Sequence, residues 1–281
     1  MTFRLAVPNK GRMERPTLEL LRRAGLQFEK TERSLSVPVR NVDLELLFVR
    51  TEDVPELVAD GVAAMGITGR DLLEESGLEL DVLVELGYGR CRLAAAVPTA
   101  SSIEDLAGLE GARIATSHVR STAAFFAAQG MNITTVPLKG SVEVAPKLNV
   151  ADAVVDLVSS GSTLMVNGLR PVATILESEA VLVADPAASH TLIAQTATML
   201  RAVVAGRGSR YVLMNAPSEK IEAIEEIIPG VDAPSVVPLA HNGMVAIHSV
   251  VAAADLWAVL PRLEAAGASG ILVLPIEQMI P

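Results

Sequence analysis

The sequence contains a single cysteine, Cys91, in 281 residues. One cysteine excludes a framework of intramolecular disulfides and a zinc site built from several thiolates. No apolar run reaches the roughly 18 residues that a membrane span requires, and the opening segment MTFRLAVPNK lacks the long apolar stretch of a secretory signal peptide. These absences predict a cytoplasmic protein without a membrane partner.

The short catalytic motifs that are easiest to identify are also missing. The sequence has no GxxxxGKS/T phosphate loop, no HExxH zinc motif, no GxSxG nucleophile elbow and no GxGxxG that opens a helix. Cys91 has no histidine in a recognisable partnership with it, which argues against a cysteine nucleophile. The histidines favour structural roles over metal binding because they are scattered along the chain, at His118, His190, His241 and His248.

Positive charge is scarce overall. The net charge is -10, from 33 acidic residues against 23 Lys and Arg. A general nucleic-acid-binding protein normally presents a basic surface, so we expect no nucleic-acid partner. An anionic small-molecule substrate would need a local basic cluster or a divalent cation. With 50% hydrophobic residues, the chain can fold into two or three domains with their own cores.

Strand-like and helix-like segments alternate through the first two-thirds of the chain, which is typical of an α/β fold. FRLAVP predicts a strand, and ERPTLELLRRAGL predicts a helix with Leu18, Leu21 and Ala24 on one face. Residues 61–78 and 149–169 each run through a short buried strand and a polar, glycine-containing turn to a helix that ends in Gly-Leu. This echo indicates two α/β lobes with a ligand cleft between them, although chance similarity among Ala, Val and Leu would also produce it.

The last part of the chain has a different order of elements. YVLMNAP, SVVPL, MVAIHSVV and GILVLPI predict strands, and SEKIEAIEEIIPG and ADLWAVLPRLEAAG predict helices. The resulting βαββαβ order predicts a separate ferredoxin-like domain. Folds of this type have many functions, so the order assigns none.

One stretch, Asp156 to Leu169, places small residues between an apolar strand and a helix-like segment: Ser159, Ser160, Gly161, Ser162 and Thr163. Backbone N–H groups in such a turn point the same way and lack intrahelical partners, so the turn suits an anion such as phosphate. Ser and Thr are also ordinary N-cap residues, and a simple helix-capping turn stays open as an alternative.

Cations gather in the turns that follow predicted strands: Lys10, Arg12, Arg50, Arg70, Arg90, Arg92 and Lys139. In α/β lobes these turns lie at the carboxyl ends of strands, where ligands bind. A charged turn is usually only solvated surface, but so many in one class of position indicate an anionic ligand. Gly11 would let the backbone approach a phosphate between two cations. The residues favour catalysis by positioning and charge stabilisation.

Seven segments, in order over nearly the whole chain, resemble the ATP phosphoribosyltransferase family: LAVPNKGRM, GITGRDLLEESG, GYGRCRLAAAVP, RIATSH, GSVEVAP, ADAVVDLVSSGSTLMVNGL and LEAAGASGILVLPIEQM. The last segment resembles the long form of the family. The resemblance implies two periplasmic-binding-protein-like (type II) lobes that form a cleft, and a homo-oligomer, dimer to hexamer. Lobe I would comprise residues 1–92 with about 176–206, lobe II residues 93–175, and a ferredoxin-like regulatory domain residues 207–281.

The resemblance also implies the reaction. Phosphoribose would pass from phosphoribosyl pyrophosphate (PRPP) to N1 of ATP with Mg²⁺ as cofactor and release of pyrophosphate, which opens histidine biosynthesis and is inhibited by histidine. Asp156 and the turn Ser159 to Thr163 would bind PRPP. We call Ser159 to Thr163 the anion turn, because its residues by themselves already suit an anion. No covalent nucleophile is implied, and Lys10, Arg12 and Arg92 would stabilise charge. The ATP and cleft residues would be Lys10, Gly11, Arg12, Arg50, Asp71, Arg90 and Glu143.

A histidine pocket is implied at Asn215, Val231, Ala233, Ser235, Val250 and Gly270. Asn215 replaces an acid found in some members of the family. Asn9 and Met13 also depart from the common pattern, as does His118, which stands where an aromatic residue is frequent. These departures concern substrate details rather than the reaction.

Two other functions compete with this interpretation. A two-lobed architecture also serves non-catalytic receptors of small anions, but the missing signal peptide counts against a periplasmic receptor, and no helix-turn-helix indicates a transcription factor. Another phosphoribosyltransferase is the second alternative, but the two acids before a Gly-Thr turn that mark the commoner type are absent. Release of pyrophosphate that requires ATP, PRPP and Mg²⁺ together distinguishes the first interpretation from both.

Overall fold

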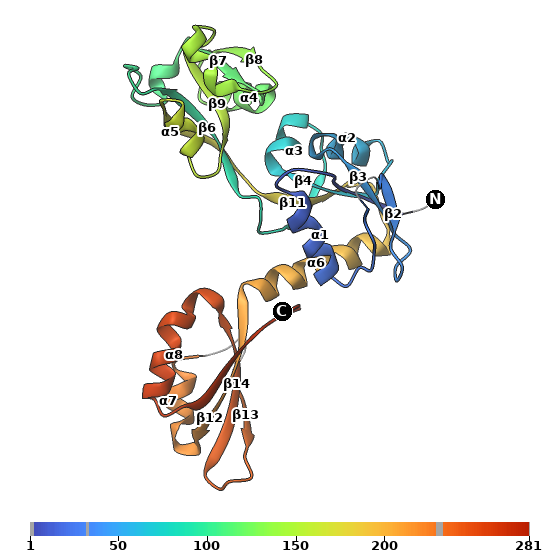
Figure 1. The fold of residues 1–281 in the computed structure, drawn as a ribbon, viewed down its shortest axis with the longest axis vertical. Coiled ribbons are helices and arrows are strands. Elements are labelled where there is room, and N and C mark those ends of the chain that lie inside the picture. The colour runs from blue at the N-terminus through green and yellow to red at the C-terminus, as the bar shows by residue number, and fades with distance from the viewer. Residues whose placement is uncertain (1–2, 32–33, 229–232, 281) are drawn as a thin grey trace. The chain divides into compact units, whose positions relative to one another are not determined.

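The computed structural model describes residues 3–31, 34–228 and 233–280, and its elements form three sheets (Figure 1). The chain divides into two compact units, Met1–Glu19 with Leu26–Ala197, and Leu20–Gly25 with Thr198–Pro281. The first two sheets belong to the first unit and the third sheet to the second. Each unit is described separately.

The first sheet has six strands, in the order β2 (Ser36–Pro38), β3 (Glu45–Val49), β1 (Arg4–Pro8), β4 (Met65–Gly69), β11 (Ala180–Ala184) and β5 (Asp81–Glu85). β1 pairs in parallel with both β3 and β4, and β11 runs antiparallel to β4. β4 and β11 are buried along their whole length, which explains their small and apolar sequences MGITG and AVLVA.

The helices of this part of the chain are α1 (Glu14–Arg23), the 3₁₀ turn η1 (Thr51–Asp53), α2 (Val54–Ala59) and α3 (Arg70–Ser76). In α1, Leu21 is buried and Leu18 is half-buried, so the predicted face points inward. Gly66 of β4 has no side chain because Val54 of α2 packs there, and an added Cβ would lie 2.3 Å from Val54 Cγ1. The absence of a side chain thus lets α2 approach the sheet closely.

The second sheet has five strands, in the order β10 (Leu169–Ser178), β6 (Cys91–Pro98), β9 (Ala153–Val158), β7 (Arg113–Thr116) and β8 (Thr134–Pro137). β7 is parallel to β8 and β9, whereas β6 is antiparallel to β9 and β10. Its helical segments are η2 (Ala107–Leu109), α4 (Val119–Ala128), η3 (Val142–Val144), η4 (Pro146–Leu148) and α5 (Ser162–Val166).

Both faces of the second sheet are buried. Leu93 of β6 packs in one core with Phe126 of α4, while Ala94 belongs to a second core with Val142 and Leu164. This arrangement follows from the alternation of side chains along a strand. The sequence CRLAAAVP therefore reads as a nearly continuous apolar run.

The second unit contains most of α6 (Thr191–Arg207), followed by β12 (Ser209–Pro217), η5 (Ser218–Lys220), α7 (Ile221–Glu225), β13 (Ser235–Pro238), β14 (Met244–Ala252), η6 (Ala253–Asp255), α8 (Leu256–Ala265) and β15 (Ser269–Pro275). The predicted βαββαβ order is confirmed, with sheet order β13-β14-β12-β15. α7 and α8 lie on the same side of the sheet (Figure 1), where Met214, Ile247 and Leu263 share one core. The other face carries the alternate side chains of each strand.

None of the helices in the described ranges combines the length and the apolar composition that a membrane crossing requires.

Candidate active site

The carboxyl ends of three neighbouring strands lie at one edge of the first sheet. β3, β1 and β4 are parallel, so the turns that follow them meet at this edge. The turn after β1 carries Lys10, Gly11 and Arg12, β3 is followed by Arg50, and β4 by Asp71. The turns that carry predicted site residues therefore meet at one edge.

The second sheet brings its predicted residues to a corresponding edge. β9 ends at Val158 and continues into the turn Ser159 to Thr163. β6 runs antiparallel to β9 and begins beside this turn, with Arg92 opposite Val158. β7, parallel to β9, ends at Thr116 and continues to His118.

Arg12 connects these two edges. Its guanidinium donates a hydrogen bond to Ser159 Oγ at 2.9 Å and another to Cys91 Sγ at 3.1 Å. The three residues come from the turn after β1, the start of β6 and the turn after β9. A side chain from the turn after β1 is thereby held against the anion turn that follows β9.

The anion turn is exposed and is shaped by a glycine. Gly161 is the N-cap of α5 and has a φ of +81°, a left-handed backbone conformation that glycine adopts without strain. The hydroxyl groups of Ser160 and Ser162 lie 2.9 Å apart, and Ser159 and Thr163 are exposed. The turn thus presents several hydroxyl groups next to the Arg12 guanidinium.

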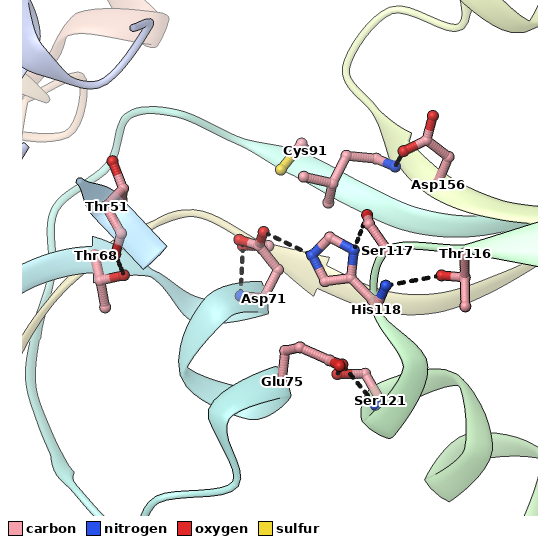
Figure 2. Close-up of polar contacts among 12 residues, drawn as sticks. Thr51, Thr68, Asp71, Glu75, Cys91, Thr116, Ser117, His118, Ser121 and Asp156 are labelled. Atoms are coloured by element: carbon pink, nitrogen blue, oxygen red, sulfur yellow. Dashed lines mark hydrogen bonds and ion pairs between the residues drawn. The ribbon is translucent and has the colours of Figure 1, made fainter. Parts of the chain in front are cut away.

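A buried polar network connects the first turn of α3 with the N-terminal end of α4 (Figure 2). Asp71 and His118 are each only 4% exposed, and His118 Nε2 lies 3.4 Å from Asp71 Oδ2. Ser178 Oγ donates to Asp71 Oδ1 at 2.5 Å, and the other imidazole nitrogen, Nδ1, is 3.0 Å from Ser117 Oγ. Burial alone would raise the pKa of Asp71, but the hydrogen bonds from His118 and Ser178 outweigh it and hold that pKa below its ordinary value.

Asp156 has the opposite electrostatic environment. Burial raises the pKa of its carboxyl group, and the nearby Glu143 raises it further. The backbone N–H of Leu157, which donates to Asp156 Oδ1 at 2.8 Å, offsets this only in part. The nearby His118 also favours the ionised form, but the net effect is a raised pKa, so ionised Asp156 is less stable here than in water.

The remaining predicted cations differ in their surroundings. Lys10 and Arg50 are exposed, and Arg90 lies 3.5 Å from Glu179 as an ion pair. Arg92 Nε is buried and has no hydrogen-bond partner within the described residues. Arg70 pairs with Glu85 at 2.6 Å.

Two residues of this region are not among those predicted from the sequence. Ser178 is 107 residues from Asp71 in the chain, so no local pattern could pair them. Glu75 contacts Arg120 and Ser121 from α3, and its only local signal is its position four residues after Asp71 on the same helix. His118 stands out in the sequence as a departure from the family pattern, and the structure places it in the polar network.

Four of the predicted histidine-pocket residues lie in the sheet of the second unit: Asn215, Ser235, Val250 and Gly270. Asn215 and Gly270 are neighbours, since an added Cβ at Gly270 would lie 3.6 Å from Asn215 Nδ2. Ser235 is opposite His248 in the sheet, and Val250 is opposite Tyr211, four residues along β12 from Asn215. Ala233 is exposed, and Val231 lies outside the described residues.

Comparisons with known proteins agree with this organisation. Residues 50–203 match the family described as ATP phosphoribosyltransferase, and residues 206–278 match the HisG C-terminal domain. The ATP phosphoribosyltransferase of Natronomonas pharaonis is 41% identical to this chain, over 99% of the chain and 100% of that protein. The one from Gemmatimonas aurantiaca is 43% identical, over 99% and 100%.

Among solved structures, a chain of the ATP phosphoribosyl transferase (HisG:HisZ) complex from Thermotoga maritima is similar, with a TM-score of 0.60 and 30% identity over 71% of this chain and 95% of that one. The structure of Tv2483 bound to L-arginine is similar in fold alone, with a TM-score of 0.50 and 14% identity over 71% and 83%. The predicted fold class, two periplasmic-binding-protein-like (type II) lobes followed by a ferredoxin-like domain, is confirmed.

Proposed function

The chain belongs to the ATP phosphoribosyltransferase family, and on this premise we propose that it joins PRPP to ATP. The phosphoribosyl group is transferred to N1 of ATP and pyrophosphate is released, as the first step of histidine biosynthesis. The observation that carries this proposal is the hydrogen bond from Arg12 to Ser159, which links a cation of the first sheet to the anion turn of the second.

PRPP is proposed to bind at the anion turn. The 5′-phosphate accepts hydrogen bonds from the hydroxyl and N–H groups of Ser159 to Thr163, and Arg12 neutralises part of its charge. The Asp156 carboxylate, at the end of β9, accepts hydrogen bonds from the ribose hydroxyls. The residues proposed to line the ATP side of the site are Lys10, Gly11, Arg12, Arg50, Asp71, Arg90 and Glu143.

The reaction needs no covalent intermediate. The lone pair of adenine N1 forms a bond to the anomeric carbon of PRPP, while the bond from that carbon to the pyrophosphate oxygen breaks and its electron pair leaves with pyrophosphate. Positive charge develops on the ribose ring and negative charge on the leaving group. Lys10, Arg12 and Arg92 stabilise the leaving charge, and fixed positions of the two substrates supply the rest of the rate enhancement.

A divalent cation suits two substrates that carry several phosphate groups, and the match to the ATP phosphoribosyltransferase family supports one. Within the described residues, no group of three or more His, Cys, Asp or Glu side chains forms a complete metal cage. Mg²⁺ binds through one or two carboxylates together with substrate phosphates, and Asp156, on the strand that leads into the anion turn, is such a carboxylate. We therefore propose Mg²⁺ as the cofactor. When bound, it supplies charge neutralisation for the leaving pyrophosphate.

The domain assignment is also a proposal. Residues 1–92 with about 176–206 form lobe I, residues 93–175 form lobe II, and residues 207–281 form a regulatory domain that binds histidine. The assignment is supported by the strands of the first sheet, which come from residues 4–85 and 180–184, and by those of the second, from residues 91–178. We place the enzyme in the cytoplasm, with its substrates.

We propose a homo-oligomer, between dimer and hexamer. The sheet face opposite α7 and α8 supports this, because Leu272 and Leu274 pair there with Leu213 and Tyr211 and are 59% and 46% exposed. Exposed apolar residues grouped on one face are typical of an interface.

Release of pyrophosphate tests the reaction. The purified protein should release pyrophosphate only when ATP, PRPP and Mg²⁺ are all present, and the product should absorb and elute as an N1-substituted adenine nucleotide. Omission of each component in turn is the control. PRPP binding without any turnover would instead support a receptor, and pyrophosphate release with another base in place of ATP would indicate a different phosphoribosyltransferase.

A further inference from the structure

A carboxylate on α3, the helix that follows β4 of the first sheet, caps α4, the helix that follows β7 of the second. Glu75 lies on α3, and its Oε1 accepts a hydrogen bond from the backbone N–H of Arg120 at 2.9 Å. Its Oε2 accepts two more at 2.9 Å, from the N–H and the hydroxyl of Ser121 (Figure 2). Arg120 and Ser121 are in the first turn of α4, so the cap comes from about 45 residues earlier in the chain.

Helix α4 depends on this external cap. The first N–H groups of a helix have no intrahelical partner, and a side chain at the N-cap position usually accepts one of them. The N-cap residue here is His118, which makes no side-chain capping bond within the described residues. A carboxylate at this end of the helix is also favoured by the helix dipole. Glu75 supplies both the hydrogen bonds and the charge.

The same face of α3 holds the N-terminal end of α4 at a second point. Asp71 and Glu75 are four residues apart and therefore lie on one side of the helix. Asp71 contacts the His118 side chain, while Glu75 holds the backbone two and three residues further along. The two carboxylates together fix the first turn of α4 against α3.

Apolar packing alone would not fix this alignment. An open cavity of about 510 Å³ lies beside the contact. Its lining combines apolar side chains such as Leu73, Phe125 and Ile175 with the polar residues Glu74, Arg120 and Ser121. The Arg120 guanidinium covers Gly77, where an added Cβ would lie 2.1 Å from Arg120 Cζ. The hydrogen bonds of Asp71 and Glu75 therefore determine how α3 and α4 are aligned.

We propose that Glu75 is a positioning residue for the transfer reaction. By capping α4, it keeps His118 and the end of β7 in place against Asp71, and it thereby sets the separation between the substrate groups held on the two sheets. Glu75 does not touch either substrate in this scheme and acts through the placement of α4. The kinetic consequence rests on the proposed function, whereas the structural consequence does not.

The kinetic test compares Glu75→Ala, Glu75→Gln and the control Glu74→Gln. Glu74 is the exposed neighbour on the same helix, so its variant changes charge without removing the cap. We expect Glu75→Ala to lower kcat by about 10- to 100-fold, the scale of a small misplacement of reacting groups. The KM values for ATP and PRPP should change much less. Glu75→Gln keeps one acceptor oxygen and should recover part of the loss.

A distance measurement tests the placement independently of activity. Spin labels at Glu56→Cys on α2 and Ala127→Cys on α4 use exposed positions, while the native Cys91 is buried. Double electron–electron resonance between these two labels should give a narrow distance distribution in the otherwise unchanged protein and in Glu74→Gln. In Glu75→Ala the distribution should be broad or shifted.

The outcomes separate the two proposals. An unchanged distance distribution in Glu75→Ala overturns the positioning role. A lower melting temperature with unchanged kcat also overturns it, because Glu75 would then only stabilise α4. A broadened distribution in a protein that never releases pyrophosphate leaves the placement by Glu75 intact and rejects the proposed function instead.

Discussion

Two carboxylates of the candidate site, Asp71 and Asp156, have opposite electrostatic environments. Hydrogen bonds from His118 and Ser178 lower the pKa of Asp71 against the effect of burial. Burial and the charge of Glu143 raise the pKa of Asp156. Ionised Asp71 therefore stabilises the fold, whereas ionisation of Asp156 lowers the free energy of unfolding. Such a destabilising carboxylate is consistent with a role in binding rather than in folding.

Asp156→Asn should make the ligand-free protein more stable at neutral pH. Because the pKa of Asp156 is raised in the folded state, its ionised form destabilises the fold at neutral pH, and the neutral amide removes that cost. We expect a melting temperature higher by a few degrees, since 1 kcal/mol corresponds to roughly 2–4 °C in domains of similar size. The gain should vanish as the pH falls below about 3.9. Calorimetry should also show weaker PRPP binding, and equal or lower stability would contradict the assigned environment.

Asp71→Asn should act in the opposite direction. The folded-state pKa of Asp71 lies below that of the unfolded chain, about 3.9, so the carboxylate stabilises the fold at neutral pH. This contribution is lost as the pH falls through the folded-state pKa. The variant should melt at a lower temperature than the parent at pH 7, and the two curves should converge in acid. A constant difference between the proteins from pH 7 to pH 3 would show that ionisation of Asp71 is not the cause.

At the scale of elements, the sequence predicts the helices and strands that have a periodic pattern of apolar residues within their own segment. The βαββαβ order of the last part of the chain follows from segments such as YVLMNAP, each of which carries its own periodicity. β10 has no such signal because its register is shifted between Pro171 and Ala173 and again between Thr174 and Leu176, which interrupts the alternation of side chains.

Contacts between distant residues could not be predicted in the same way. Arg12 and Cys91 are 79 residues apart, and nothing in either segment indicates the other. The anion turn could be singled out from the residues themselves, because Gly161 and its hydroxyl neighbours stand together in the chain. Which cation meets that turn depends on the pairing of the two sheets, and only the structure identifies it as Arg12.

The anion turn should lose PRPP affinity when Gly161 becomes alanine. Gly161 has a φ of +81°, and an L residue with a Cβ pays roughly 1–2 kcal/mol there. If the turn relaxes to avoid this strain, PRPP should bind about 5- to 30-fold more weakly. Gly168→Ala is a matched control, since Gly168 has a φ of +70° just beyond the other end of α5. Equal loss of affinity in both variants, measured by calorimetry, would remove the turn from the binding site.

At the scale of the whole molecule, the chain has two parts. The two sheets of the first unit share the candidate site, and the second unit is a βαββαβ domain with its own core. The residues predicted to bind histidine all belong to this second unit, and they are distant in the chain from Arg12 and the anion turn. A ligand bound there can change the reaction only if it binds better to one conformation or assembly of the enzyme than to another. Histidine should therefore inhibit without simply competing with PRPP.

Ser235→Trp should abolish inhibition by histidine and leave most of the activity. Ser235 begins β13, is exposed, and lies opposite His248, so a bulky side chain there fills the proposed pocket without entering the core. Ala258→Trp adds the same bulk at an exposed position of α8 and should be inhibited like the parent. Initial rates across a histidine titration and calorimetric binding of histidine distinguish the outcomes. Normal inhibition of Ser235→Trp means that the pocket lies elsewhere, and a parent protein that binds no histidine leaves the second unit with a role in assembly alone.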